Sequence, residues 1–112
     1  MGGRCCKDMY GRDFSLQDAQ TCVGKGWNKL IESCYNICLE NDVEIWQIKE
    51  KFGGLRFYVG SAPNIVHEII DQVEGESYNI CELCGRDGKV GGKSWLKCLC
   101  SDCRKEHSNE NI

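Results

Sequence analysis

Two Cys-x-x-Cys pairs near the end of the sequence constrain the fold of this chain more than any other feature. Cys81 and Cys84 form the first pair, Cys100 and Cys103 form the second, and fifteen residues separate the two pairs. A C-x-x-C turn lets two sulfurs converge on one metal ion, and two such turns complete a tetrahedron. The sequence therefore predicts one structural Zn²⁺, bound by these four thiolates in a C-terminal zinc ribbon.

Other ligands and other chemistry compete with this interpretation. Cys98 lies two residues before Cys100 in the segment CLCSDC, and His107 follows Cys103 by four residues. The spacing of the first pair favours Cys100 with Cys103, so Cys98 is expected to remain a free thiol. A redox pair and an iron–sulfur cluster are the remaining alternatives. A redox C-x-x-C normally belongs to a βαβ pattern, which this sequence lacks.

The high cysteine content is also compatible with a secreted disulfide scaffold, because the 112 residues include ten cysteines. The opening residues MGGRCC contain no apolar segment typical of a signal peptide, and no apolar run is long enough for a membrane helix. Cys34 and Cys38 lie at helical spacing among apolar residues, as reduced core thiols do. We therefore expect a reducing cytoplasm. The sequence assigns no role to Cys5, Cys6 or Cys22.

Hydrophobic periodicity predicts an α+β body over residues 1–80, followed by a zinc-binding module over residues 81–112. Apolar residues recur with a helical period over 27–40 and again over 62–77, which indicates two amphipathic helices. Segments 43–51 and 55–59 alternate like the strands of a β-hairpin. The two helices are expected to pack on this hairpin.

Local signals refine these boundaries. Residues 1–13 show no period and are expected to be irregular. Ser15 and Asp18 form a capping box for a short helix that Gly24 and Gly26 end. The sequence Phe52-Gly53-Gly54 predicts the hairpin turn, since both glycines accept positive φ. The charged residues after Cys103 are expected to fray.

Charge is unevenly distributed along this chain of net charge −3. The hairpin segment 48–60 carries three cations against one acid, and residues 81–107 carry six basic against four acidic side chains. The hairpin and the ribbon are therefore expected to share a basic face. Phe57 and Tyr58 beside Arg56 offer rings on which a base can stack, although cross-strand packing is the alternative. The predicted ligand- or partner-binding residues are Lys49, Lys51, Arg56 and Tyr58.

Longer motifs add a resemblance to a known family. Gly26-Trp27…Leu30-Ile31, IKEKFGGLRFYV at 48–59, CELCGRDG at 81–88 and WLKCLCSDC at 95–103 resemble a family of small, largely uncharacterised phage and prophage proteins. The resemblance covers residues 24–104, and KEKFGGLRFY is its most specific part. Asp87 replaces the family's usual Pro, and Cys98 replaces Thr or Ser; neither is among the expected metal ligands.

This resemblance implies a phage-encoded protein that acts in the host bacterial cytoplasm. Its expected function is host takeover or counter-defence, by binding or sequestering a host protein or a signalling nucleotide. The alternative is a regulatory zinc ribbon that binds nucleic acid, which the acidic net charge disfavours. An enzyme is not expected, because the sequence lacks a Ser–His–Asp arrangement, an H-E-x-x-H motif and a phosphate-cradling loop. The sequence predicts neither an oligomeric state nor the identity of the partner.

Overall fold

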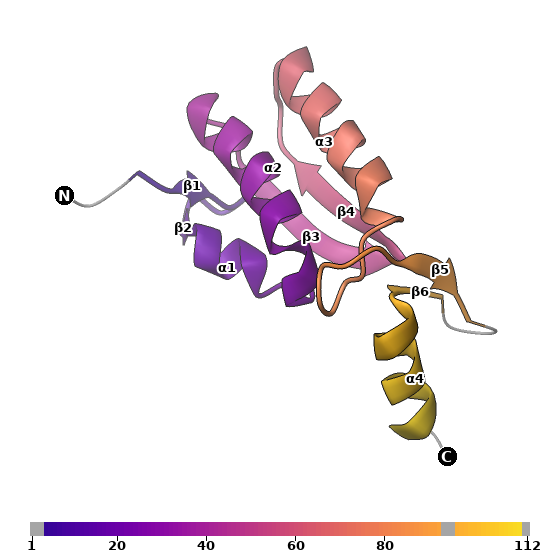
Figure 1. The fold of residues 1–112 in the computed structure, drawn as a ribbon. Helices are drawn as coiled ribbons and strands as arrows, with labels where there is room; N and C mark the ends of the chain where they lie inside the picture. Colours follow the sequence, from indigo (N-terminus) through magenta and orange to yellow (C-terminus); the bar gives the residue numbers. More distant parts are fainter. Residues whose placement is uncertain (1–3, 93–95, 111–112) are drawn as a thin grey trace.

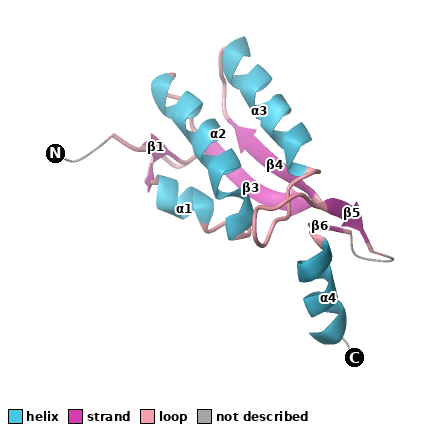
Figure 2. Cartoon of the chain, in the orientation of Figure 1, coloured by secondary structure: helices cyan, strands magenta, loops and turns pink. Residues whose placement is uncertain are grey.

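The protein is a small α+β structure in which helices pack around short antiparallel hairpins (Figures 1 and 2). This computed structural model describes residues 4–92 and 96–110, and the side chains only as far as residue 106. In chain order the elements are β1 (Cys6–Lys7), β2 (Asp13–Phe14), α1 (Leu16–Gln20), the 3₁₀ helix η1 (Lys25–Trp27), α2 (Asn28–Glu40), β3 (Ile45–Lys51), β4 (Gly54–Val59), α3 (Asn64–Ser77), β5 (Lys89–Gly91), β6 (Lys97–Leu99) and α4 (Ser101–Glu110).

The N-terminal segment is more regular than the sequence predicted. Residues 1–13 were expected to be irregular; residues 1–3 lie outside the described part, and in the rest β1 pairs with β2 as a short antiparallel hairpin. The Tyr35 hydroxyl, from α2, accepts a hydrogen bond from the Cys6 N–H at 2.9 Å and donates to the Phe14 carbonyl at 2.8 Å. Because strands of two residues have no detectable period, this tertiary contact was not predictable from the local sequence.

The two predicted amphipathic helices are α2 and α3, which lie side by side across one face of β3–β4 (Figure 1). The predicted capping box is confirmed at α1, where Ser15 and Asp18 bond each other's backbone N–H groups. The main core consists of one face of α2, the inner face of the hairpin and part of α3. Its largest fully buried side chains are Trp27, Ile31, Ile45, Leu55 and Val66.

The β3–β4 hairpin departs from the predicted alternation at one point. Its register slips between Ile45 and Gln47, so that Trp46 forms a β-bulge. Ile45 and Ile48 are therefore both buried, whereas Trp46 is exposed. The turn also differs from the expectation, because Phe52 and Gly53 carry the positive φ angles, at 55° and 87°, and Gly54 is already the first residue of β4.

Helix α3 lies against the outer edge of β4 and satisfies its backbone. The Leu55 N–H donates to Ser77 Oγ and the Phe57 N–H donates to Glu74 Oε2, each at 2.8 Å. These contacts cover one edge of the two-stranded sheet. The apolar stripe of α3 is narrower than predicted, since Val66 is buried but Ile65 is exposed.

The C-terminal module consists of a loop, the β5–β6 hairpin and α4. The second cysteine pair lies where β6 passes into α4, because Cys100 precedes this helix and Cys103 lies in its first turn. The charged segment after Cys103, expected to fray, belongs to α4, which extends to Glu110 and lies apart from the two core helices (Figure 1). Its charged sequence has no apolar stripe, so periodicity gave no helical signal.

Candidate metal centre and binding face

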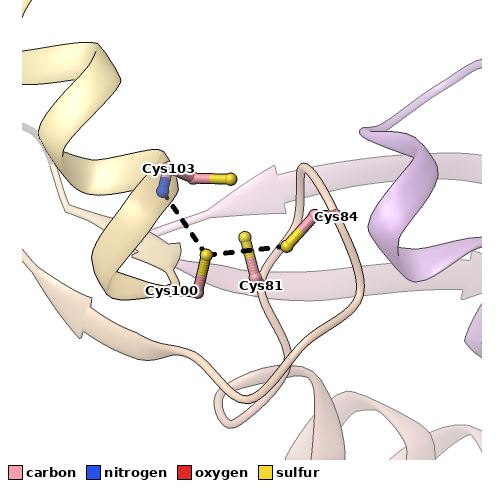
Figure 3. A group of neighbouring side chains, drawn as sticks. All are labelled: Cys81, Cys84, Cys100 and Cys103. Carbon is pink, nitrogen blue, oxygen red and sulfur yellow. Dashed lines mark hydrogen bonds between the residues drawn. The ribbon is translucent and has the colours of Figure 1, made fainter.

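The four predicted ligand sulfurs converge on one point. The Sγ atoms of Cys81, Cys84, Cys100 and Cys103 all lie within 4.8 Å of one another, and Cys84 and Cys100 approach to 3.5 Å (Figure 3). A metal–sulfur bond of about 2.3 Å places the sulfurs of a tetrahedral site about 3.8 Å apart. The four cysteines therefore form a cluster that can hold one metal ion.

Backbone N–H groups stabilise the thiolate form within this cluster. Burial by itself raises the pKa of Cys81, but hydrogen bonds from the backbone of Cys100, Cys84 and Leu83 outweigh it and lower the pKa to about 7. The Cys103 N–H similarly donates to Cys100 Sγ at 3.4 Å. Thiolates are the metal-binding form of cysteine, so these hydrogen bonds favour metal binding at Cys81, whereas the hydrogen bond with the Cys100 thiol raises the pKa of Cys103.

The loop that carries Cys81 and Cys84 is fixed to η1 by close backbone contacts. The Gly26 N–H donates to the Glu82 carbonyl at 2.7 Å, and the Trp27 indole N–H donates to the Ile80 carbonyl at 2.8 Å. A Cβ on Gly26 would lie 2.1 Å from the Cys81 carbonyl oxygen. Gly26 is therefore required for the close packing of η1 on the metal loop. The sequence predicted only that Gly26 helps to end the preceding helix.

A partly buried charge network joins the cluster to the β3–β4 hairpin. Lys97 Nζ lies 3.1 Å from Glu50 Oε1 and 3.4 Å from Glu82 Oε1. Glu82 also accepts a hydrogen bond from the Gly24 N–H at 3.1 Å. Burial lowers the pKa of Lys97, but the hydrogen bond that its ammonium donates to Glu50 and the negative charge of Glu82 outweigh burial, so the pKa is raised overall.

The remaining cysteines lie outside the cluster, and all ten are free thiols in the structure. Cys98 is fully buried in the main core, and its thiol lies 3.2 Å from the carbonyl oxygens of Tyr78 and Ile80. It is thus separated from the metal ligands, as expected. The side chain of His107, the alternative ligand, lies outside the described residues. Burial raises the pKa of Cys38 to about 12 and that of Cys34 further, as for inert core thiols.

The predicted binding residues share the face of β3–β4 that points away from the core. The register places Lys49 opposite Arg56 and Gln47 opposite Tyr58. Phe57, expected as a stacking ring beside Tyr58, instead faces the core opposite Ile48 and is buried. We call the outer residues of this hairpin, together with the bulged Trp46, the open face. Its members are Trp46, Gln47, Lys49, Lys51, Gly54, Arg56 and Tyr58.

The cations of the open face contact aromatic rings. Lys49 lies 5.7 Å from the centre of the Tyr58 ring, Lys51 5.6 Å from Phe52, and Arg56 5.9 Å from Tyr78. In the described part of the chain, none of the three cations forms an ion pair with a carboxylate. The strand positions of this face include no acidic residue, because Glu50 points to the opposite side.

A shallow hollow occupies one end of the open face. Its volume is about 450 Å³, and its lining includes the predicted Lys49 and Tyr58. Lys51 and Arg56 lie outside it on the same face. Sequence reasoning missed Met9, Trp46 and Gln47, which complete the lining. Trp46 was assigned to a strand without a bulge, and Met9 reaches this place only through the fold of the β1–β2 hairpin.

Three basic side chains of the C-terminal module, which was expected to share a basic face with the hairpin, bond to groups near them. Lys97 pairs with Glu50 and Glu82, and Arg86 pairs with Asp102 at 3.3 Å. The Arg104 guanidinium donates to the backbone carbonyls of Lys89 and Lys97. These three cations bond to groups within the module or at its junction with the body, whereas Lys89 and Lys105 are exposed.

Comparisons with known proteins return no relative. No family model matches the chain, and no curated protein or solved structure matches it significantly. The resemblance to phage proteins therefore depends on the quoted motifs alone. Within the described residues, none of the helices combines the length and the apolar character that crossing a membrane requires.

Proposed function

We propose that this chain is a zinc-stabilised binding protein whose ligand occupies the open face of the β3–β4 hairpin. The observation that carries the proposal is the row of cations Lys49, Lys51 and Arg56, which contact aromatic rings and have no carboxylate partner among the described residues. Lys51 is exposed, whereas Lys49 and Arg56 are half-buried; a cation gains about 0.5–1 kcal/mol from a ring at an exposed site and about 2 kcal/mol when desolvated. An anionic ligand offers each of these cations a stronger partner.

Zinc is the metal that best suits the four-cysteine cluster. Four thiolates from two C-x-x-C pairs form a closed tetrahedral site, which is typical of structural zinc. When bound, the ion supplies folding free energy and leaves no coordination position for a substrate. A closed site of this kind provides no catalytic metal, so we assign the proposed binding activity to the open face and not to the cluster.

The proposed role of binding is to block or sequester a host factor. The motif resemblance implies a phage-encoded protein in the bacterial cytoplasm, where host takeover or counter-defence requires occupation of a host protein or removal of a signalling nucleotide. Both partners are compatible with a small cationic, aromatic face. The regulatory nucleic-acid-binding alternative uses the same side chains, and steep salt dependence would distinguish it.

The proposal is tested by presenting zinc-loaded protein to bacterial lysate and quantifying retained proteins and nucleotides by mass spectrometry. Lys51→Glu, on the open face, is compared with Lys29→Glu, an exposed lysine of α2. Both variants change charge equally. We expect retention of a specific partner by the wild type and by Lys29→Glu, and its loss in Lys51→Glu. Equal retention by both variants would place binding elsewhere and contradict the proposal.

A further inference from the structure

The hollow on the open face contains a preoriented aromatic side chain. Trp46 is 48% exposed, yet its indole N–H donates to Glu44 Oε1 at 3.0 Å. Gly60 lies behind the ring, since a Cβ at this position would be 3.0 Å from Trp46 Nε1. The indole is therefore held in place while much of its surface faces solvent. An exposed ring held in this way is suited to stack on a planar ligand group.

The rest of the hollow provides complementary groups around this ring. Tyr58 is 41% exposed and lines the same hollow, and Gln47 offers an amide with both donor and acceptor capacity. Lys49 reaches the hollow, and Arg56 lies directly opposite Lys49 in the strand register. Aromatic surface, a hydrogen-bonding amide and two cations thus lie within one small area.

We propose that this hollow binds a nucleoside phosphate, with the base stacked on Trp46 or Tyr58 and the phosphate between Lys49 and Arg56. The inference rests on the proposed function, because it assigns a ligand class to the same face. A phosphate gives the Lys49 ammonium a stronger partner than the Tyr58 ring and frees this ring for the base. An acidic peptide satisfies the cations but provides no planar group for Trp46.

Two sources supply this chemistry, a free nucleotide and a single-stranded nucleic acid. A strand places further phosphates along the face, toward Lys51, whereas a mononucleotide contacts the hollow and the neighbouring Arg56. With three phosphates neutralised, the logarithm of the affinity for a single strand should fall against the logarithm of salt concentration with a slope of about −2. A mononucleotide should show a much shallower dependence.

The test uses zinc-loaded full-length protein and three probes. A fluorescent single-stranded DNA of mixed sequence, roughly ten nucleotides long, is titrated by anisotropy. AMP and cyclic di-AMP are titrated by calorimetry and are also tested as competitors of the strand. Polyglutamate, which represents an acidic peptide, is tested as a competitor in the same way. Quenching of tryptophan emission reports stacking. We expect binding of the strand or of a free nucleotide with quenching, and the tighter of the two identifies the source.

The variants separate stacking from charge. Trp46→Leu should weaken binding by roughly 5- to 150-fold, as for loss of one base-stacking ring, and should abolish most of the quenching. Lys51→Gln should reduce the salt slope for the strand by about 0.7 and should weaken AMP binding less than Trp46→Leu does, because Lys51 lies on the open face but outside the hollow. Lys29→Gln is the control and should change neither. Zinc content and thermal unfolding establish that each variant is folded.

Two outcomes would overturn the ligand class. One is the absence of binding by the DNA, AMP and cyclic di-AMP to folded wild-type protein. The other is equal competition by polyglutamate with no effect of Trp46→Leu, which would mean that the face recognises charge alone. Either result leaves the binding function testable by the lysate experiment, in which Lys51→Glu must still lose its partner. If that experiment also fails, both proposals fail.

Discussion

The cysteine cluster and the open face of the hairpin differ in whether their polar groups have partners within the protein. Around the cluster, backbone N–H groups point at sulfurs, and Lys97 pairs with Glu50 and Glu82. On the open face, Lys49 and Arg56 contact aromatic rings and have no carboxylate partner in the described chain. A region whose polar groups are satisfied internally stabilises the fold, whereas an unbalanced exposed region is available for a ligand.

The two regions are nevertheless physically connected. Glu50 belongs to β3, and its carboxylate accepts hydrogen bonds from the Lys97 ammonium of β6 and from the Gly53 N–H in the hairpin turn. Loss of the metal site should therefore disturb the turn end of the hairpin as well as its own loop. The predictions below test this division of roles, beginning with the changes that should remove the most stability.

Cys81→Ser should have the largest effect, because Cys81 is fully buried at the centre of the cluster. Loss of a structural metal ligand belongs to the class of changes that cost about 4–5 kcal/mol or more. We expect loss of zinc, measured by elemental analysis, and a large fall in thermal stability. Cys22→Ser, at an exposed thiol outside the cluster, is the matched control. Full zinc content in Cys81→Ser would contradict the site.

Gly26→Ala should come next, since a Cβ would lie 2.1 Å from the Cys81 carbonyl and 2.6 Å from the Glu82 carbonyl. Backbone must move to relieve this overlap, which costs about 1–3 kcal/mol or more. Gly75→Ala is the control, because it lies in α3 with open space around it. That change should stabilise the protein by about 0.5–1 kcal/mol. Denaturant unfolding measures both variants, and equal behaviour would contradict the close packing of η1 on the metal loop.

Lys97→Met should cost about 2 kcal/mol, because it leaves Glu50 and Glu82 without the cation that they share in a partly buried place. Lys89→Met, at an exposed lysine of β5, is the control and should change stability by less than about 0.5 kcal/mol. Denaturant unfolding, with and without added salt, measures the free energy of unfolding of both variants. A cost in Lys97→Met no greater than in the control would show that the network does not join the two regions.

The sequence predicted the parts of this structure whose cause is local. The helical stripe of α2, the Ser15 capping box and the spacing of the two cysteine pairs each depend on residues a few positions apart. The bulge at Trp46 and the role of Gly26 depend on what packs against them from distant segments. Helix α4 has no apolar period to reveal it. The metal ligands were thus readable, while most of the hollow became visible only in three dimensions.

Lys51→Gln should have the smallest effect on stability, and comparing it with Lys97→Met distinguishes the open face from the metal module. Lys51→Gln removes a cation that is exposed and whose described partner is the Phe52 ring, so stability should change by less than about 0.5 kcal/mol. Lys97→Met removes the same charge where Glu50 and Glu82 surround it. Only Lys51→Gln should weaken retention of the host partner at unchanged zinc content. Denaturant unfolding and the lysate assay measure both quantities on the same preparations. A destabilisation of Lys51→Gln as large as that of Lys97→Met would mean that the open face supports the fold in the way the metal module does, and its cations would then need no ligand to explain them.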